Sequence, residues 1–413
     1  MKTIDGELST TGREIRDTAD RRPVPRWHDR RRRMDMRVAI AAAAAVLLIA
    51  AIGIPVLWLR SSDQLDRAAD APPPADFGTW REMAEAPIVA RPNAVSVWTG
   101  TEAVFWAGSS LNRGFAYTDG AAYDPLSDTW RHLAVPGWGH PGLSGVFFDG
   151  ELYALAKGGG TRLNPSDGTW TDLPPVAGMY LSAAVATDQA VWGLGPAATN
   201  PGGQPDIAIA RFDPEGDRWI YGPVFDGTSE IGALFEDLLF LEQPVLWTGS
   251  EIVLWDPDGG GLAFNPTTEV WQRLAVPVPP SGVLATSRAT VAGSSLVAVA
   301  EVTTDGASSI SVATHRDGSW TWRDLGITFD DFAAVTVAAA SDWVVLLAPN
   351  RAPIVFHAPS GAWTQAGDGP LAGLQSPNVV WTGDGLVIWG GIGSPTASNL
   401  DPAQGAVWTP PAG

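Results

Sequence analysis

Residues 98–130 read WTGTEAVFWAGSSLNRGFAYTDGAAYDPLSDTW, and two turn patterns in this stretch decide the predicted fold. The first is a Trp-Thr-Gly turn that begins at Trp98 and leads through an apolar run to Trp106. Gly, Asp and Ser between two apolar stretches are typical of a β-hairpin turn. The second is Tyr123-Asp124-Pro125, followed by Trp130. Because Asp-Pro initiates turns and Pro cannot continue a strand ladder, this pattern ends one strand and the Trp opens the next.

Both patterns recur along the chain in strict alternation, seven times each. The hairpin pattern repeats clearly at Trp247-Thr248-Gly249 and Trp381-Thr382-Gly383, where each copy again reaches its next Trp after eight residues. Four weaker copies lie between these three. The tryptophans of the second pattern are 40 to 52 residues apart, at Trp130, Trp170, Trp219, Trp271, Trp320, Trp363 and Trp408.

This period, with four strands in each repeat, is typical of propeller blades. The sequence therefore predicts an all-β fold, a seven-bladed β-propeller over residues 77–413. The copy that ends in Trp320 is degenerate, so a six-bladed ring is the alternative. Trp80 is an eighth copy without a hairpin before it. Either the strand of Trp80 or the strand of Trp408 is then expected to close the ring, because closure removes a sheet edge.

The repeats resemble the kelch repeat of the galactose oxidase superfamily, over roughly residues 77–413. In that family the second strand of a blade tends to end in a glycine pair, which an aromatic-Asp-Pro turn and a Trp follow. Gly390-Gly391 keeps this pair, Gly158-Gly159 resembles it, and Ala107-Gly108 keeps half of it. The resemblance implies a kelch-like propeller.

The oxidase activity that this resemblance would imply does not fit the composition. It needs a copper ion bound by tyrosines and histidines, and a tyrosine joined to a cysteine. The chain has no Cys and only five His, which lie far apart and without ligand spacing. We therefore expect no cofactor. Calcium on the oxygen-rich loop 256–259 is conceivable, but a plain hairpin turn is the favoured interpretation of that loop.

A run of twenty-two residues without charge, Val38–Leu59, precedes the repeats. A helix of that length rises roughly 33 Å, enough to cross a hydrocarbon core of about 30 Å. Arg37 and Arg60 flank the run, and four arginines precede it at residues 30–33. We expect a basic cytoplasmic tail (1–37), a single transmembrane helix (38–59), a Pro-rich linker (60–76) and a propeller outside the cell membrane (77–413). Secretion after cleavage of a signal peptide is the alternative.

The distribution of charge agrees with this orientation. The tail, residues 1–37, carries eleven Lys and Arg against seven Asp and Glu, whereas the rest of the chain carries 26 − 11 = 15 against 45 − 7 = 38. The net charge of −19 argues against nucleic acid as a partner, because binding to phosphates needs clustered Lys and Arg. Arg and Ala abound while Lys is rare, a composition typical of a bacterial protein with a GC-rich genome.

In a propeller, the loops between second and third strands share one face with the connections between blades. The longer inserts of this chain, residues 109–119, 195–206, 226–243 and 303–309, fall on that face. Variable loops on a rigid frame are where binding sites usually lie. Residues 230–240 have apolar spacing that suits one or two helical turns, either exposed for a partner or packed on the blades. The residues predicted to form a binding face are Arg113, Trp138, His140, Glu230, Phe235, Glu236 and Asp237.

No motif for catalysis stands out in the sequence. We therefore predict a membrane-anchored module that binds an unknown protein or glycan. A carbohydrate-active enzyme at the cell surface is one alternative, since 38 acidic residues after the tail make carboxylate pairs unavoidable. A sensor that reports to the cytoplasmic tail is the other alternative.

Overall fold

The computed structural model describes residues 77–411 apart from 111–115, 134–143, 157–158, 198–205, 226–244, 259, 276, 317, 350, 367–373 and 394–404. The chain divides into two compact units, Met1–Arg60 and Ser61–Gly413, and every described residue belongs to the second unit. The predicted transmembrane helix lies outside the described residues. Within the described part of the chain, no helix is both long enough and apolar enough to cross a membrane.

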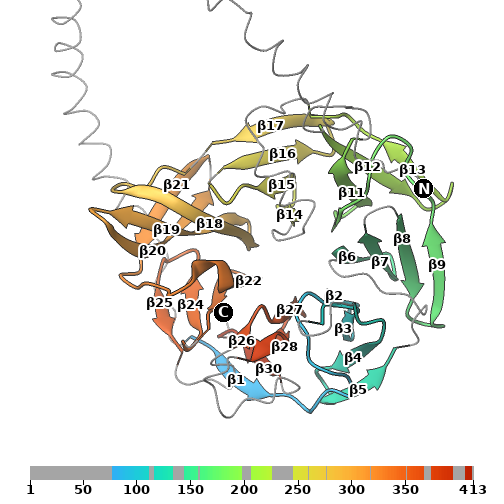
Figure 1. Ribbon diagram of the computed structural model, residues 1–413, viewed down its shortest axis with the longest axis horizontal. Helices are drawn as coiled ribbons and strands as arrows, with labels where there is room; N and C mark the ends of the chain where they lie inside the picture. Colours follow the sequence, from blue (N-terminus) through green and yellow to red (C-terminus); the bar gives the residue numbers. More distant parts are fainter. Residues whose placement is uncertain are drawn as a thin grey trace, which may run out of the picture. The chain divides into compact units, whose positions relative to one another are not determined.

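Seven four-stranded sheets are arranged around a ring, which confirms the seven-bladed propeller (Figure 1). Blades 1 to 6 are antiparallel meanders whose strands run from the centre of the ring outward in chain order. Their strands are β2 (Val95–Trp98), β3 (Ala103–Trp106), β4 (Gly120–Asp124) and β5 (Thr129–His132) in blade 1; β6 (Ser144–Phe148), β7 (Glu151–Ala156), β8 (Gly159–Asn164) and β9 (Thr169–Leu173) in blade 2; β10 (Ala183–Ala186), β11 (Val191–Pro196), β12 (Ile207–Asp213) and β13 (Arg218–Tyr221) in blade 3; β14 (Val245–Trp247), β15 (Ile252–Trp255), β16 (Gly261–Asn265) and β17 (Val270–Leu274) in blade 4; β18 (Val283–Ala292), β19 (Ser295–Thr304), β20 (Ala307–Arg316) and β21 (Ser319–Asp324) in blade 5; β22 (Thr336–Ala340), β23 (Trp343–Leu347), β24 (Ile354–His357) and β25 (Trp363–Gln365) in blade 6.

Blade 7 joins the two ends of the propeller. Its strands, from the centre outward, are β27 (Asn378–Trp381), β28 (Leu386–Trp389), β30 (Ala406–Thr409) and the N-terminal strand β1 (Thr79–Glu82). Two further short strands, β26 (Leu374–Gln375) and β29 (Ile392–Gly393), pair beside it, and a short 3-10 helix, η3 (Phe332–Ala334), lies between blades 5 and 6.

The closing blade corrects the expectation for Trp408. Trp80 in β1 pairs directly with Trp408 in β30, just as Trp130 in β5 pairs with Tyr123 in β4. Trp408 therefore takes the place of the aromatic residue on the third strand, and Trp80 takes the place of the outer Trp. Burial agrees, because Trp408 and Tyr123 are both fully buried while Trp80 and Trp130 are only partly buried.

Blade 5 corrects two further expectations. It is a complete blade in which His315 pairs with Trp320, so the six-bladed alternative is wrong. Its first three strands are ten residues long, the longest of the described strands. The insert expected at residues 303–309 is a two-residue turn between extended strands, with Asp305 at φ 52° and Gly306 at φ 82°.

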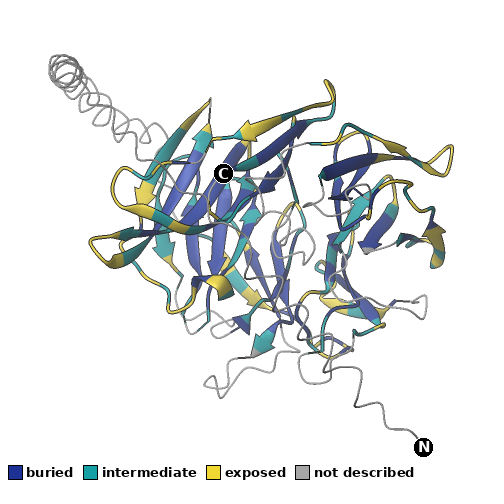
Figure 2. Cartoon of the chain, turned by 45° about the horizontal axis from the view of Figure 1, so that its top comes forward, coloured by how far each residue is buried: buried dark blue, intermediate teal, exposed yellow. Residues whose placement is uncertain are grey.

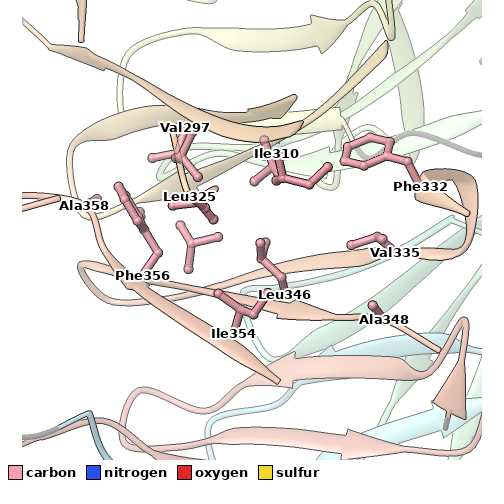
Figure 3. Packing of buried hydrophobic residues seen from close by; sticks show 14 residues of the cluster. Val297, Ile310, Leu325, Phe332, Val335, Leu346, Ala348, Ile354, Phe356 and Ala358 are labelled. Atoms are coloured by element: carbon pink, nitrogen blue, oxygen red, sulfur yellow. The ribbon is translucent and has the colours of Figure 1, made fainter. Parts of the chain in front are cut away.

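The core lies between neighbouring blades rather than within any one of them. Second strands such as β3 are wholly buried, inner strands such as β6 are half-buried, and outer strands such as β5 bury only their Trp in part (Figure 2). Figure 3 shows one such cluster, in which Val297 and Ile310 of blade 5 pack against Leu346 and Phe356 of blade 6. Each of these side chains contributes about 1.5–3 kcal/mol when fully buried. Packing of this kind holds the ring together.

The strand order gives the ring two different faces. The turns between first and second strands and between third and fourth strands lie on one side, which we name the short-turn face. They are two to five residues long in blades 1 to 6 and four residues long in blade 7. The loops between second and third strands and the connections between blades lie on the other side, the loop-rich face, where residues 222–244 form the longest connection.

Local hydrogen bonds explain why the short turns form. The Thr99 hydroxyl accepts a bond from the Glu102 amide at 3.0 Å and donates one to the Glu102 carbonyl at 3.1 Å. Thr248 and Thr382 repeat this arrangement in blades 4 and 7. In the second pattern, the Asp124 carboxylate accepts the Leu126 amide at 2.8 Å, a bond that stabilises an Asx-turn. Each of the two sequence signatures thus forms a turn that is stabilised by hydrogen bonds between its own residues.

Candidate functional site

The seven residues predicted to form a binding face all lie outside the described residues. The strands that flank them are described, and each of these connections starts and ends at the loop-rich face. The residues concerned are Arg113 between β3 and β4, Trp138 and His140 between β5 and β6, and Glu230, Phe235, Glu236 and Asp237 between β13 and β14.

The described part of the loop-rich face gathers half-exposed apolar side chains at the end of blade 3. Tyr180 is 50% exposed, Tyr221 41% and Val224 37%. Together with Asp206 we name these residues the blade-3 patch. Tyr180 precedes β10, Tyr221 ends β13, and Val224 follows it toward blade 4. Three aromatic or branched side chains in partial contact with water offer a rigid surface to a ligand at low entropic cost.

Backbone pairing beyond the named strands fixes the patch. The Ala197 amide donates to the Asp206 carbonyl at 2.8 Å, which extends the β11–β12 ladder toward the loop-rich face. The Tyr180 amide donates to the Pro196 carbonyl at 2.9 Å on one side of this extension. Because main-chain bonds hold these residues, the patch belongs to the frame of the propeller.

The Asp206 carboxylate gives the patch its polar group. Its Oδ1 atom is shielded from solvent and accepts no hydrogen bond in the described structure. Burial raises the pKa of Tyr221, and the negative charge of Asp206 raises it further. The Tyr221 hydroxyl reaches the Gly178 carbonyl at 3.5 Å. A shielded acceptor beside an aromatic ring suits a ligand that brings N–H or O–H donors.

Arg91 is a second polar feature of the loop-rich face, and its role is structural. Its side chain is 1% exposed, forms an ion pair with Asp119, and lies 3.8 Å from the centre of the Tyr117 ring. It also donates to the Val89 carbonyl at 2.7 Å and to the Ala107 carbonyl at 3.3 Å. Burial alone would raise the pKa of Asp119, but the hydrogen bonds and charge of Arg91 outweigh it and lower that pKa.

The backbone of Arg91 ties blade 1 to blade 7. Its carbonyl accepts bonds from the Asn378 amide group at 2.7 Å and from the Gly391 amide at 2.9 Å. A Cβ atom on Gly390 would lie 2.7 Å from the same carbonyl oxygen. The glycine pair singled out in the sequence thus allows this close approach. Nothing in the sequence around Arg91 marked it as the centre of this contact.

The Asp256 loop behaves as a turn. The Asp258 amide donates to the Asp256 carboxylate at 3.0 Å, and the Asp256 amide donates to the Gly260 carbonyl at 3.1 Å. Burial raises the pKa of Asp256. Among the described residues, no group of three or more His, Cys, Asp or Glu is placed to hold a metal ion.

A Ser–His contact in blade 6 has the geometry of a turn cap. His357 Nδ1 lies 2.7 Å from the Ser360 hydroxyl. Ser127 makes the equivalent 2.7 Å contact with the Asp124 carboxylate in blade 1, so His357 replaces an Asx-turn residue. The strand register agrees with this role, because Phe356, not His357, pairs with Trp363. Burial lowers the pKa of His357.

Four of the repeat tryptophans, Trp130, Trp219, Trp271 and Trp320, pack on the aromatic residue of the preceding strand. Their ring centroids lie 4.9 to 5.1 Å from Tyr123, Phe212, Phe264 and His315. Two of them also donate a hydrogen bond across the boundary between neighbouring blades, which we name a seam. Trp130 Nε1 donates to the Ala84 carbonyl at 2.8 Å, and Trp271 Nε1 donates to the Pro223 carbonyl at 2.9 Å. In both cases the acceptor lies four residues after the outer Trp of the preceding blade.

Comparisons with known proteins agree with this architecture. The sequence matches no protein-family profile and no curated protein. Among solved structures, it is similar to a fungal alcohol oxidase of the AA5 family, determined in complex with copper. The TM-score is 0.57 at 13% identity, and the match covers 81% of this chain and 77% of that one. The predicted resemblance to galactose oxidase-like kelch propellers is therefore confirmed at the level of the fold.

Proposed function

We propose that this chain is a membrane-anchored, extracytoplasmic binding module whose loop-rich face takes a protein or glycan ligand. The observation that carries this proposal is the contrast between the faces. The short-turn face consists of compact turns closed by their own hydrogen bonds. The loop-rich face presents longer connections and, at blade 3, half-exposed tyrosines held by backbone pairing. A rigid frame with one irregular face is the usual arrangement of a binding domain.

The test is a screen of the full chain, in detergent or lipid nanodiscs, against cell-envelope glycans and proteins. A double variant, Tyr180→Ala with Tyr221→Ala, is compared with a control, Leu126→Ala with Val270→Ala, which removes exposed apolar groups from the short-turn face. We expect the patch variant to weaken binding by about tenfold or more, since one interface hot spot contributes 2 kcal/mol or more. The control should bind like the wild type. Equal losses in both variants, or a loss in the control alone, would contradict the proposal.

A carbohydrate-active enzyme is the second candidate, because Asp206 offers a shielded carboxylate beside Tyr221. Most glycosidases need two carboxyl groups about 5 to 9.5 Å apart, and Asp206 would be one of them. Asp206→Asn separates the two functions. A variant that still binds a glycan but no longer cleaves it favours the enzyme. A variant that loses binding of a glycan that neither protein cleaves favours the binding module.

A further inference from the structure

The connection between blades 4 and 5 exposes a run of apolar residues on the loop-rich face. It contains Pro277-Val278-Pro279-Pro280-Ser281, which we name the proline segment. Val278 is 77% exposed, Pro280 is exposed, and Val283 of β18, which is 70% exposed, follows shortly after. Because these groups are neighbours in the chain, they form a patch rather than isolated apolar side chains. An exposed apolar patch indicates an interaction site.

The propeller holds the proline segment at both ends. At one end, Pro277 is buried. At the other end, Gly282 has φ 80°, and a Cβ atom there would lie 2.6 Å from the Thr303 carbonyl oxygen. This close approach lays the chain on the extended end of blade 5, where Val283 pairs with Thr303. Between the two ends, no hydrogen bond to the backbone of residues 278–281 is found among the described residues.

The prolines restrict the backbone of the segment before any partner binds. A proline ring fixes φ at about −65°, and the residue before a proline is directed into the extended or polyproline II region. Val278 precedes Pro279, and Pro279 precedes Pro280, so both residues follow this rule. A polyproline II strand has no internal hydrogen bonds, and a restricted backbone loses little entropy on binding. The segment is therefore suited to recognition in the polyproline II conformation.

We propose that the proline segment docks into a groove of a partner protein that is lined by aromatic side chains. Such a groove packs its rings on the prolines and the valine, and its Tyr and Trp side chains donate to the free carbonyls. Residues 274–287 contain no charged side chain, so ion pairing does not drive the contact. A lipid surface fits less well, because residues 277–283 lack the Trp, Phe, Lys and Arg of a membrane-binding segment. The inference names a kind of protein ligand for the loop-rich face, so it rests on the proposed function but not on the membrane anchor.

The test titrates the full chain in detergent with purified SH3, WW and EVH1 domains, whose grooves bind proline-rich segments. Isothermal titration calorimetry measures the affinity. We expect at least one domain to bind, and Val278→Asp to weaken its binding about tenfold or more, because a charge would enter an apolar contact. Pro279→Ala should weaken binding by a smaller factor, because it frees the backbone before binding. The control is Leu126→Asp on the short-turn face, where Leu126 is 95% exposed, and it should bind like the wild type.

A lack of binding by every domain, or an equal loss in Val278→Asp and Leu126→Asp, would overturn the inference. Lipid is tested with a fluorescent dye on the Val278→Cys or Leu126→Cys variant in nanodiscs, since the chain has no other cysteine. Stronger quenching by spin-labelled lipid at position 278 than at position 126 would assign the segment to the bilayer and also overturn the inference. These results leave the proposed function standing, because the screen with the blade-3 patch variant decides that function independently.

Discussion

Two seams between blades show how one repeat serves two purposes. At the seam of blades 3 and 4, Trp271 donates to the Pro223 carbonyl, and the surrounding contacts are apolar, with Trp192 5.3 Å from Phe264. At the seam of blades 7 and 1, Trp130 makes the same bond to Ala84. Among the described residues of the two seams, only the second includes a buried arginine, Arg91.

The difference lies in what each seam has to hold. Each blade from 1 to 6 is continuous in sequence, whereas blade 7 recruits β1 from the other end of the propeller. Arg81 of β1 pairs with Asp128 at 3.0 Å and reaches the Tyr123 hydroxyl at 3.2 Å. Tyr123 in turn donates to Asp128 at 2.6 Å, which lowers the pKa of Asp128; burial raises the pKa of Tyr123 to about 12. Hydrogen bonds and ion pairs are directional, so these contacts fix the position of β1 against blade 1. Apolar packing is not directional and specifies that position less strictly.

The largest expected effect is at the closing seam. Arg91→Met should lower the free energy of unfolding by roughly 3–4 kcal/mol, because the Val89 and Ala107 carbonyls each lose a donor at about 1–3 kcal/mol. Asp119 contributes less to this loss, since its side chain is half-exposed and water can replace Arg91. Denaturant unfolding measures this loss. The control is Arg131→Met, which removes the half-exposed pair with Glu102 and should cost less than about 1 kcal/mol. Similar losses in the two variants would mean that Arg91 is no more important to the ring than a surface charge.

A smaller effect is expected at the glycine pair. Gly391 has φ 88°, and a Cβ atom there would lie 2.6 Å from the Gln375 carbonyl oxygen. Gly391→Ala should cost about 3 kcal/mol from strain and steric overlap together. Gly383 has φ 95° in an open hairpin turn, where no atom would lie within 4 Å of the new Cβ. Gly383→Ala isolates the strain, about 1 kcal/mol. If both variants lose the same stability, close approach at the seam is unimportant.

The shared tryptophan bond should contribute equally to both seams. Trp130→Phe and Trp271→Phe each remove one indole N–H and leave a carbonyl without its donor. Each variant should lose about 1–2 kcal/mol in thermal or denaturant unfolding, from the lost bond and the smaller ring. A much larger loss for Trp130 would show that the closing seam depends on this bond more than the ordinary seam does.

The smallest effect concerns pH and lies away from both seams. The pKa of His357 is lowered by burial in the folded protein, so folding favours its neutral form. Its contribution to stability is therefore complete above the unfolded pKa of about 6.5 and is lost as pH falls below that value. His357→Gln should flatten the decline in stability between pH 7 and pH 5. An unchanged pH profile would show that His357 does not titrate differently on folding.

The sequence favoured the correct number of blades because both signatures are local, although the degenerate copy in blade 5 left six blades as an alternative. In each signature, the Thr or Asp side chain lies within four residues of the backbone groups that it bonds. The signature can therefore be recognised from residue spacing in the sequence alone. The closing strand could not be chosen in this way. Leu400-Asp401-Pro402 precedes Trp408 and matches the pattern that predicts an outer strand. In the fold, however, Trp408 pairs with Trp80 of β1, which is far away in sequence.

The sequence contained even less information about the ion pair of Arg91 and about the blade-3 patch. Arg91 lies in the connection between β1 and β2, and Asp119 lies in the loop between β3 and β4. Neither belongs to a repeated pattern, and only the fold brings them together. Tyr180, Asp206 and Tyr221 come from three separate segments that meet where the β11–β12 ladder extends. The residues that the sequence did nominate, such as Phe235, remain a prediction. Variation in loop length indicates which face of a propeller can hold a binding site, but it rarely indicates which side chains form that site.

Ring closure by β1 also has a consequence for biosynthesis. β1 leaves the ribosome first among the strands, but its partner β30 follows roughly 330 residues later. At 5–20 residues per second this delay is about 15–65 s, during which β1 has no ladder to join. Once made, β30 can accept β1 from its own chain or from a neighbouring nascent chain. Crowded synthesis would therefore favour strand-exchanged dimers, and slow dilution after denaturation would favour closed monomers.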